Sequence, residues 1–229
     1  MRRWLTIVIG SLFILQGCVL DNEVELNKQE KETGKRMNEQ LIQAVERKET
    51  EKIRSLIEQG ADINTQDSEG RTSTMIATYN HDVETAKILI DVNIQDDMKN
   101  SPFLYAGAEG YIDILKLAIE AGADPSITNR YGGTALIPAS EHGYVEVLKE
   151  LLSKTDIDVN HVNDLGWTAL LEAIILNDGD GKQQQTVQLL IDHGADVNIP
   201  DNSSMTPLQH AREKGFKEIE QILLSAGAK

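Results

Sequence analysis

Cysteine is almost absent from this 229-residue chain, in which Cys18 is the only one. The chain therefore cannot close an intramolecular disulfide. Basic residues are also scarce: 22 lysines and arginines stand against 37 aspartates and glutamates, which gives a formal net charge of -15. So acidic a chain offers no dense patch of cations for phosphate groups, and we expect no nucleic-acid partner. The charge favours solubility and a basic partner instead.

Motifs of enzyme chemistry are missing as well. The sequence contains no Gly-x-Ser-x-Gly, no His-Glu-x-x-His and no glycine-rich phosphate loop. No histidine stands at metal-ligand spacing from another histidine or from the cysteine. We therefore predict no catalytic site, no metal, no cofactor and no enzyme activity. The loop Asp178-Gly179-Asp180-Gly181 faintly resembles a calcium loop, but the EF-hand pattern needs more ligands, so a flexible loop is the preferred interpretation and calcium the alternative.

The chain has one long apolar run, close to its first residue. Trp4 to Leu15 is apolar over about a dozen residues, too short for a comfortable membrane span, and it follows a basic start. It ends in Leu15-Gln16-Gly17-Cys18, which resembles a bacterial lipobox. The resemblance implies a lipoprotein signal peptide over residues 1–17 and acylation of Cys18 after cleavage. An uncleaved signal anchor with an incidental cysteine is the alternative.

This interpretation predicts a protein in the cell envelope, lipid-anchored on the non-cytoplasmic side of a bacterial membrane. Several acyl chains on Cys18 are enough for stable anchoring. Residues 18–36 then form a charged tether, because they have too few apolar side chains to fold alone. A flexible chain of this length spans roughly 20–25 Å. We expect the first helix to start near Met37.

The rest of the chain repeats itself. Gly-Ala-Asp-x-Asn occurs at Gly60 to Asn64 and again at Gly194 to Asn198, and Thr-Pro-Leu or a near relative occurs five times between Thr72 and Leu208. The period is about 33 residues, which resembles the ankyrin repeat. The resemblance implies an all-α solenoid of about six helix-turn-helix repeats with hairpin-like turn tips. The expected repeats cover residues 37–66, 67–95, 96–128, 129–162, 163–200 and 201–229.

Two repeats depart from this frame. In the second, Asp91-Val92-Asn93 arrives about four residues early, because most of the Gly-Ala-Asp turn is missing. Solenoids depend on contacts between neighbouring repeats, so we expect this repeat to be the least stable internal one. The fifth repeat has an insertion of about five residues within Asn177 to Gln183, between its two expected helices.

The ankyrin resemblance also implies a binding face. In that family the hairpin tips and the ends of the first helices line a concave surface that binds proteins. Placed on this chain, the pattern predicts protein-binding residues at Tyr79, Met98, Arg130, Tyr131, Leu165, Trp167 and Met205. Aromatic residues are only 4% of the chain, yet Tyr131 and Trp167 fall on adjacent tips, and exposed aromatics are typical of binding hot spots. We expect Trp167 to point outward; the alternative is that it packs on its own hairpin.

The sequence thus predicts a membrane-anchored ankyrin-repeat protein that binds a protein partner through its concave face. The alternative is an accessory or protective factor for an exported enzyme, for example one related to stress. Nothing in the residues identifies the partner, because specificity in such a frame lies in the variable surface side chains.

Overall fold

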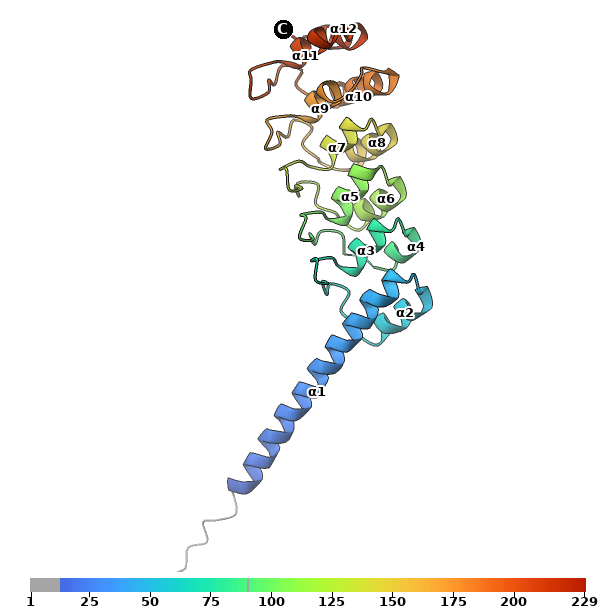
Figure 1. Ribbon diagram of the computed structural model, residues 1–229, viewed down its shortest axis with the longest axis vertical. Coiled ribbons are helices and arrows are strands. Elements are labelled where there is room, and N and C mark those ends of the chain that lie inside the picture. Colours follow the sequence, from blue (N-terminus) through green and yellow to red (C-terminus); the bar gives the residue numbers. More distant parts are fainter. Residues whose placement is uncertain (1–12, 90) are drawn as a thin grey trace, which may run out of the picture.

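The computed structural model describes the backbone of residues 13–89 and 91–229, and side chains from residue 25 onward except those of residues 26 and 90. Over this part of the chain there are twelve α-helices and no β-strand, with one isolated bridge between Gln66 and Thr72. The helices form six antiparallel pairs stacked in a column (Figure 1). The pairs are α1 (Phe13–Glu46) with α2 (Thr50–Glu58), α3 (Ser73–Tyr79) with α4 (Val83–Ala86), α5 (Pro102–Glu109) with α6 (Ile112–Glu120), α7 (Leu136–Glu141) with α8 (Val145–Lys154), α9 (Ala169–Ile175) with α10 (Gly181–Asp192), and α11 (Pro207–Lys214) with α12 (Lys217–Ser225).

The predicted fold class is confirmed. Helices α3, α5, α9 and α11 begin where the Thr-Pro-Leu markers predict, because a hydroxyl there caps the helix, whereas α7 begins at Leu136 without a side-chain cap. The side chains of Thr72, Ser101, Thr168 and Thr206 each accept a hydrogen bond from the N–H three residues later. Proline stands in the first turn after Ser101 and Thr206, where a missing N–H costs nothing.

Five hairpin tips share one construction. Each begins with an aspartate or asparagine whose Oδ1 accepts N–H groups from the residues two and four positions later, at 2.8–3.0 Å. These residues are Asp67, Asp96, Asn129, Asn163 and Asp201. Their side chains hold the turn by satisfying backbone donors. The turn aspartates are therefore structural, as the family pattern implies.

The residue at the fourth position of each tip has positive φ, and the space available for its side chain depends on the tip of the next repeat. At Gly132, with φ 71°, an added Cβ would lie 2.5 Å from Oδ1 of Asp164 on the following tip. The same position holds Lys99 and Ser204, with φ 58° and 63°. Positive φ alone thus tolerates other residues, and a side chain at position 132 would also require the carboxylate of Asp164 to move aside.

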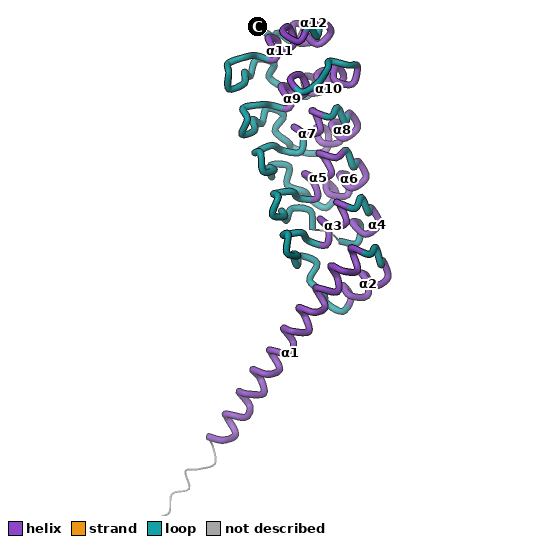
Figure 2. Tube along the Cα trace, in the orientation of Figure 1, coloured by secondary structure: helices purple, strands orange, loops and turns teal. Residues whose placement is uncertain are grey.

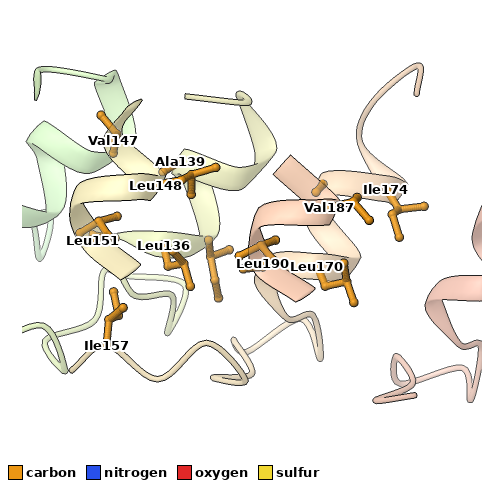
Figure 3. Packing of buried hydrophobic residues seen from close by; sticks show 14 of the residues in the cluster. Leu136, Ala139, Val147, Leu148, Leu151, Ile157, Leu170, Ile174, Val187 and Leu190 are labelled. Atoms are coloured by element: carbon orange, nitrogen blue, oxygen red, sulfur yellow. The ribbon is translucent and has the colours of Figure 1, made fainter. Parts of the chain in front are cut away.

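Thin layers of leucine, isoleucine, valine and alanine fill the space between successive pairs. Figure 3 shows Leu136, Leu148 and Leu151 of the fourth pair beside Leu170 and Leu190 of the fifth. All five side chains are buried. Because each pair contacts only its neighbours, this packing, repeated along the column, is the source of stability.

The second pair interrupts that pattern. Its outer helix α4 has 4 residues, whereas α8 has 10. The buried side chains divide at this point into one cluster that ends at Leu89 and another that begins at Val92. An apolar cleft of about 230 Å³ beside α4 is lined by Leu89, Val92 and Leu117, among others. These observations agree with the expectation of a weak second repeat, which stays a prediction until opening is measured.

The expected tether is helical instead. Helix α1 runs without interruption from Phe13 to Glu46, so the start predicted near Met37 is wrong (Figure 1). The segment is rich in glutamate, lysine and glutamine, which have high helix propensity. Nζ of Lys35 also lies 3.9 Å from Oε1 of Glu39, at the i,i+4 spacing that favours a helix. A helix that is polar all round needs no core of its own. The low apolar content of residues 18–36 predicted a flexible tether, but this segment is part of α1.

Residues 18–36 therefore form a helical stalk that continues into the first repeat as one helix. Residues 18–36 rise about 27 Å as a helix, at 1.5 Å per residue. The last turns of α1 bury Leu41, Ala44 and Val45 against the repeats, which fixes the stalk to the column. Residues 1–12 of the expected signal peptide, and the side chain of Cys18, lie outside the described residues. None of the described helices is long and apolar enough to cross a membrane.

Candidate functional site: the inner face

The hairpin tips lie along one side of the column, and the outer helices α4, α6, α8, α10 and α12 lie along the other (Figure 2). We call the side made by the tips and the first helices α3, α5, α7, α9 and α11 the inner face. Backbone hydrogen bonds join some neighbouring tips directly. Asp97 N–H donates to the carbonyl of Glu69 at 3.1 Å, and Asp164 N–H donates to the carbonyl of Tyr131 at 3.0 Å. The tips are thus a frame rather than independent loops.

Three predicted residues form an exposed apolar row on this frame. Met98, Tyr131 and Leu165 each stand at the third position of a tip, and their exposed fractions are 49%, 53% and 51%. We call these three residues the tip row. Arg130 is also exposed, and its guanidinium carbon lies 4.8 Å from the centre of the Tyr131 ring. Their shared register places one apolar side chain on each of three consecutive tips.

Trp167 does not stand free as expected. It occupies the fifth position of its tip and is half-buried, like Met205 at the same position of the last tip. Its N–H donates to Oδ1 of Asn163 at 3.0 Å. Trp167 lines a cleft together with Leu165. Trp167 therefore lies on the inner face but is partly buried, which differs from the outward position expected for it.

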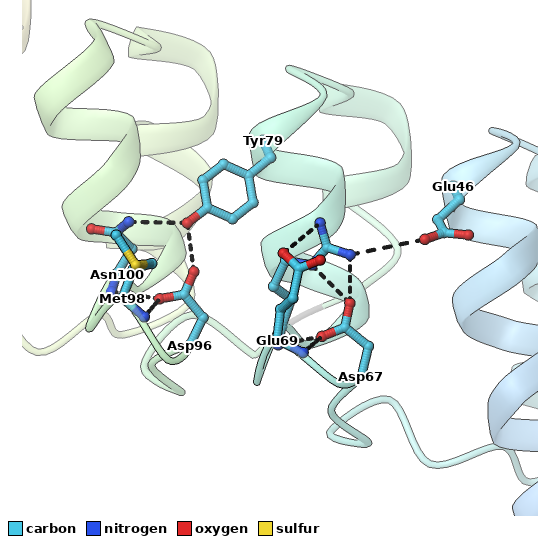
Figure 4. Close-up of polar contacts among 8 residues, drawn as sticks. Glu46, Asp67, Glu69, Tyr79, Asp96, Met98 and Asn100 are labelled. Carbon is cyan, nitrogen blue, oxygen red and sulfur yellow. Dashed lines mark hydrogen bonds and ion pairs between the residues drawn. The ribbon is translucent and has the colours of Figure 1, made fainter.

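Tyr79 serves the frame. Its hydroxyl donates to Oδ2 of Asp96 at 2.5 Å and accepts from Nδ2 of Asn100 at 3.0 Å, so it joins the second repeat to the tip of the third repeat (Figure 4). Burial, followed by the hydrogen bond to Asp96, raises the pKa of Tyr79 to about 12. Its ring also packs edge-on against Tyr105, with centroids 4.4 Å apart. Tyr79 is thus committed to intramolecular contacts at both ends of its side chain.

A cluster of aromatic side chains lies beside α3 and α5 and was not predicted from the sequence. Tyr105 packs edge-on against Tyr111 at 6.2 Å, and Tyr111 stacks on His81 at 3.9 Å between ring centres. A sequence signal existed: an aromatic residue follows the glycine between the two helices in Gly110-Tyr111, Gly143-Tyr144 and Gly215-Phe216. An added Cβ at Gly110 would lie 3.1 Å from the Tyr144 ring, so this aromatic packs on the preceding repeat.

The fourth and fifth repeats enclose a cleft of about 270 Å³ on the inner face. It brings together three of the predicted residues, Tyr131, Leu165 and Trp167, with the acidic residues Glu141 and Glu172. The lining residues are Asn129, Tyr131, Gly133, Ile137, Pro138, Glu141, Asn163, Leu165, Trp167, Glu172 and Leu176. The other four predicted residues do not line it. We call this the Trp167 cleft.

Glu172 is the unusual group of the Trp167 cleft. Its side chain is 6% exposed, and its Oε1 accepts a hydrogen bond from Nδ2 of Asn163 at 2.9 Å. Burial, and then the charge of Glu141, raise the pKa of Glu172 to about 7. The sixth repeat has a different pair at these two positions, in which Nε2 of His210 lies 2.9 Å from Oδ2 of Asp201. An amide at 163 suits Glu172, because an aspartate there would add a second acid.

The inserted loop of the fifth repeat has a helix-capping role. Oδ1 of Asp180 accepts the N–H of Gln183 at 2.9 Å, which caps α10. Nδ2 of Asn177 donates to the carbonyl of Glu141 at 2.8 Å, so the loop also holds the end of α7. Over the described residues, no three histidine, cysteine, aspartate or glutamate side chains are grouped so that they could hold a metal ion.

The fold and the inner face together define the class of protein, which is a helical repeat solenoid with exposed apolar side chains along its tips. The family model for ankyrin repeats, in three copies, matches residues 41–129, 104–201 and 136–229, so this chain belongs to the ankyrin repeat family. Proteins of this family are typically interaction modules without enzyme activity, and their partners are generally proteins.

Relatives agree with this assignment. The chain is 41% identical over 189 residues to the ankyrin repeat protein YahD of Escherichia coli (strain K12), and the match covers 81% of this chain and 94% of YahD. The crystal structure of an ankyrin repeat domain from Acinetobacter baumannii AYE superposes with a TM-score of 0.81 at 48% identity, over 82% of this chain and 98% of that one. The crystal structure of another ankyrin repeat protein superposes with a TM-score of 0.78 at 40% identity, over 80% of this chain and 96% of that one.

Proposed function

We propose that this protein binds another protein through the tip row and the Trp167 cleft. The observation that carries the proposal is the register of Met98, Tyr131 and Leu165: three large apolar side chains, each about half exposed, repeat at one position of three consecutive tips. Such residues on a rigid frame cost little entropy to bury in a partner. Truncation of one well-placed tyrosine or tryptophan at the centre of an interface costs about 2 kcal/mol of binding free energy.

Site-specific cross-linking in the producing cell tests this proposal. A photoreactive amino acid replaces Leu165 or Tyr131 on the inner face, or Lys149 on the outer helix α8 as the matched control. We expect the two inner positions to give the same adduct with one protein, and the control position to give none. Adducts from position 149 alone, or none from any position, would contradict binding through the inner face.

We further propose that Cys18 carries a lipid anchor and that the protein lies in the cell envelope, on the non-cytoplasmic side of a bacterial membrane. The support is the lipobox-like Leu15-Gln16-Gly17-Cys18 after a basic start and an apolar run. The α1 stalk then separates the repeats from the membrane surface. Metabolic labelling with a fatty acid should mark the wild type and not Cys18→Ser. Label retained by Cys18→Ser would refute the anchor.

An exported enzyme is one partner that suits this location, and the protein then acts as its accessory or protective factor. Deletion of this protein should lower the activity or stress resistance of the cross-linked partner. If the partner has no enzyme activity, or keeps all of it after deletion, the accessory function fails while protein binding stands.

A further inference from the structure

The Trp167 cleft combines features that together select a ligand chemistry. Two carboxylates from different repeats, Glu141 of α7 and Glu172 of α9, line it beside two aromatic rings, Tyr131 and Trp167. Its volume of about 270 Å³ is below the usual size of a pocket for a drug-sized molecule. The cleft therefore suits a single long side chain rather than a cofactor or a folded element.

Among the described residues, no lysine, arginine or histidine forms an ion pair with either carboxylate. The hydrogen bond to Glu172 comes from the neutral amide of Asn163, and burial, followed by the charge of Glu141, raises the pKa of Glu172. The backbone around Glu141 is fixed, because Asn177 and Gln183 donate to its carbonyl at 2.8 and 3.0 Å. Like charges held on a rigid frame favour a ligand that brings the opposite charge.

The walls of the cleft suit the rest of a basic side chain. Aromatic faces attract ammonium and guanidinium groups, and Arg130 already places its guanidinium 4.8 Å from the Tyr131 ring. Leu165 and Leu176, which are 51% and 47% exposed, offer apolar surface for the methylene stem. The chain as a whole has a net charge of -15, which draws a basic partner toward it.

We propose that the Trp167 cleft takes the side chain of one arginine or lysine on the bound protein, whose cation pairs with Glu172 and Glu141 while Trp167 and Tyr131 flank it. The proposal rests on the proposed function, since it assumes a protein docked on the inner face. It adds the chemistry of the central contact and makes that partner basic at one defined point.

A pH dependence follows from the groups around Glu172. The helices packed against α9 are α7, α10 and α11. From α7, Glu141 faces Glu172, and from α10 the nearby Gln183 is neutral. On α11, His210 pairs with Asp201. Lys214, also on α11, donates to the carbonyl of Asn177 at 3.5 Å. With the pKa of Glu172 at about 7, its ionised fraction rises roughly tenfold from pH 6 to pH 8, so cation binding should tighten by up to about tenfold.

Selected peptides test the proposal on the full-length protein in detergent. A displayed library of random peptides is selected on the wild type and depleted on the double variant Tyr131→Ala/Leu165→Ala, which leaves peptides that need the tip row. We expect these peptides to share an arginine or lysine. Its replacement by neutral citrulline or norleucine should weaken binding to the wild type at least tenfold, and binding to Glu172→Gln less than twofold.

The variant Glu172→Gln keeps the fold, because its side-chain carbonyl can still accept from Asn163; its circular dichroism and melting are recorded beside each affinity. Tip-dependent peptides without a shared basic residue would overturn the proposal, and so would equal losses on wild type and Glu172→Gln. In both cases the proposed function stands. If no peptide is removed by depletion on the double variant, the proposed binding face itself fails.

Discussion

The second and the fifth repeats show what the same frame does under two opposite changes. The second has lost most of a turn, and its outer helix is reduced to 4 residues. The fifth has gained a loop, and its outer helix has 12 residues. Both keep the capped first helix and the Asp or Asn tip. The loss leaves a cleft where the core divides, whereas the gain buttresses the Trp167 cleft on the inner face. Changes outside the tip and cap are thus tolerated, with different consequences for packing and for binding.

The largest expected effect contrasts the cores of a complete and a shortened repeat. Leu148→Ala in the fourth repeat should lower the free energy of unfolding by about 3–4 kcal/mol, because its side chain is fully buried between complete pairs. Leu89→Ala in the second repeat should cost about 2 kcal/mol, because Leu89 borders an existing cleft. Urea unfolding of both variants measures the difference. Equal losses would show that the second repeat is packed as well as the fourth.

A second prediction concerns the charge of the Trp167 cleft. Glu172→Gln should raise the free energy of unfolding by about 3 kcal/mol at pH 8 and by less than about 1 kcal/mol at pH 5. The pKa of Glu172 is raised to about 7, so the folded state holds the proton more tightly than the unfolded state. The resulting stability is complete below the ordinary glutamate pKa and is lost as the pH rises toward 7. Melting curves of both proteins at the two pH values check the sign; a gain that does not grow with pH would refute it.

A third prediction separates two neighbouring tip residues. Trp167→Ala should lower stability by about 1–2 kcal/mol as well as affinity, because the ring is half-buried in the cleft. Leu165→Ala should lower affinity about tenfold and stability by less than about 0.5 kcal/mol, because its side chain is 51% exposed. Binding and melting are measured together on each variant. Lys149→Ala on α8 is the control that should change neither.

Most of the fold could be predicted from the sequence, because the repeat markers have local physical functions. Thr168 caps a helix through its own hydroxyl and Asn163 closes a tip through its own side chain, so both can be read from a few neighbouring residues. The start of α1 could not be read in the same way. Helix propensity and low apolar content point in opposite directions over residues 18–36, and the sequence offers no contact that decides between them.

The candidate site was predicted only in part, for a similar reason. The register of a tip predicts that Tyr131 and Leu165 face outward, but the depth of Trp167 depends on how the fourth and fifth repeats meet. Glu172 was missed because it lies on a helix among apolar residues, where a single carboxylate has no distinctive spacing. Its role becomes visible only when Glu141 of the preceding repeat is placed beside it.

Hydrogen exchange on the free and the peptide-bound protein tests the central claim most directly, which is that binding belongs to the fourth and fifth repeats and weakness to the second. With a tip-dependent peptide bound, amides of the tips around Tyr131 and Leu165 should exchange at least tenfold more slowly. Amides of residues 83–89 should exchange fastest among the internal helices in both states and stay unchanged on binding. Protection centred on the second repeat or on the outer helices, or equal exchange in the second and fourth repeats of the free protein, would contradict this account.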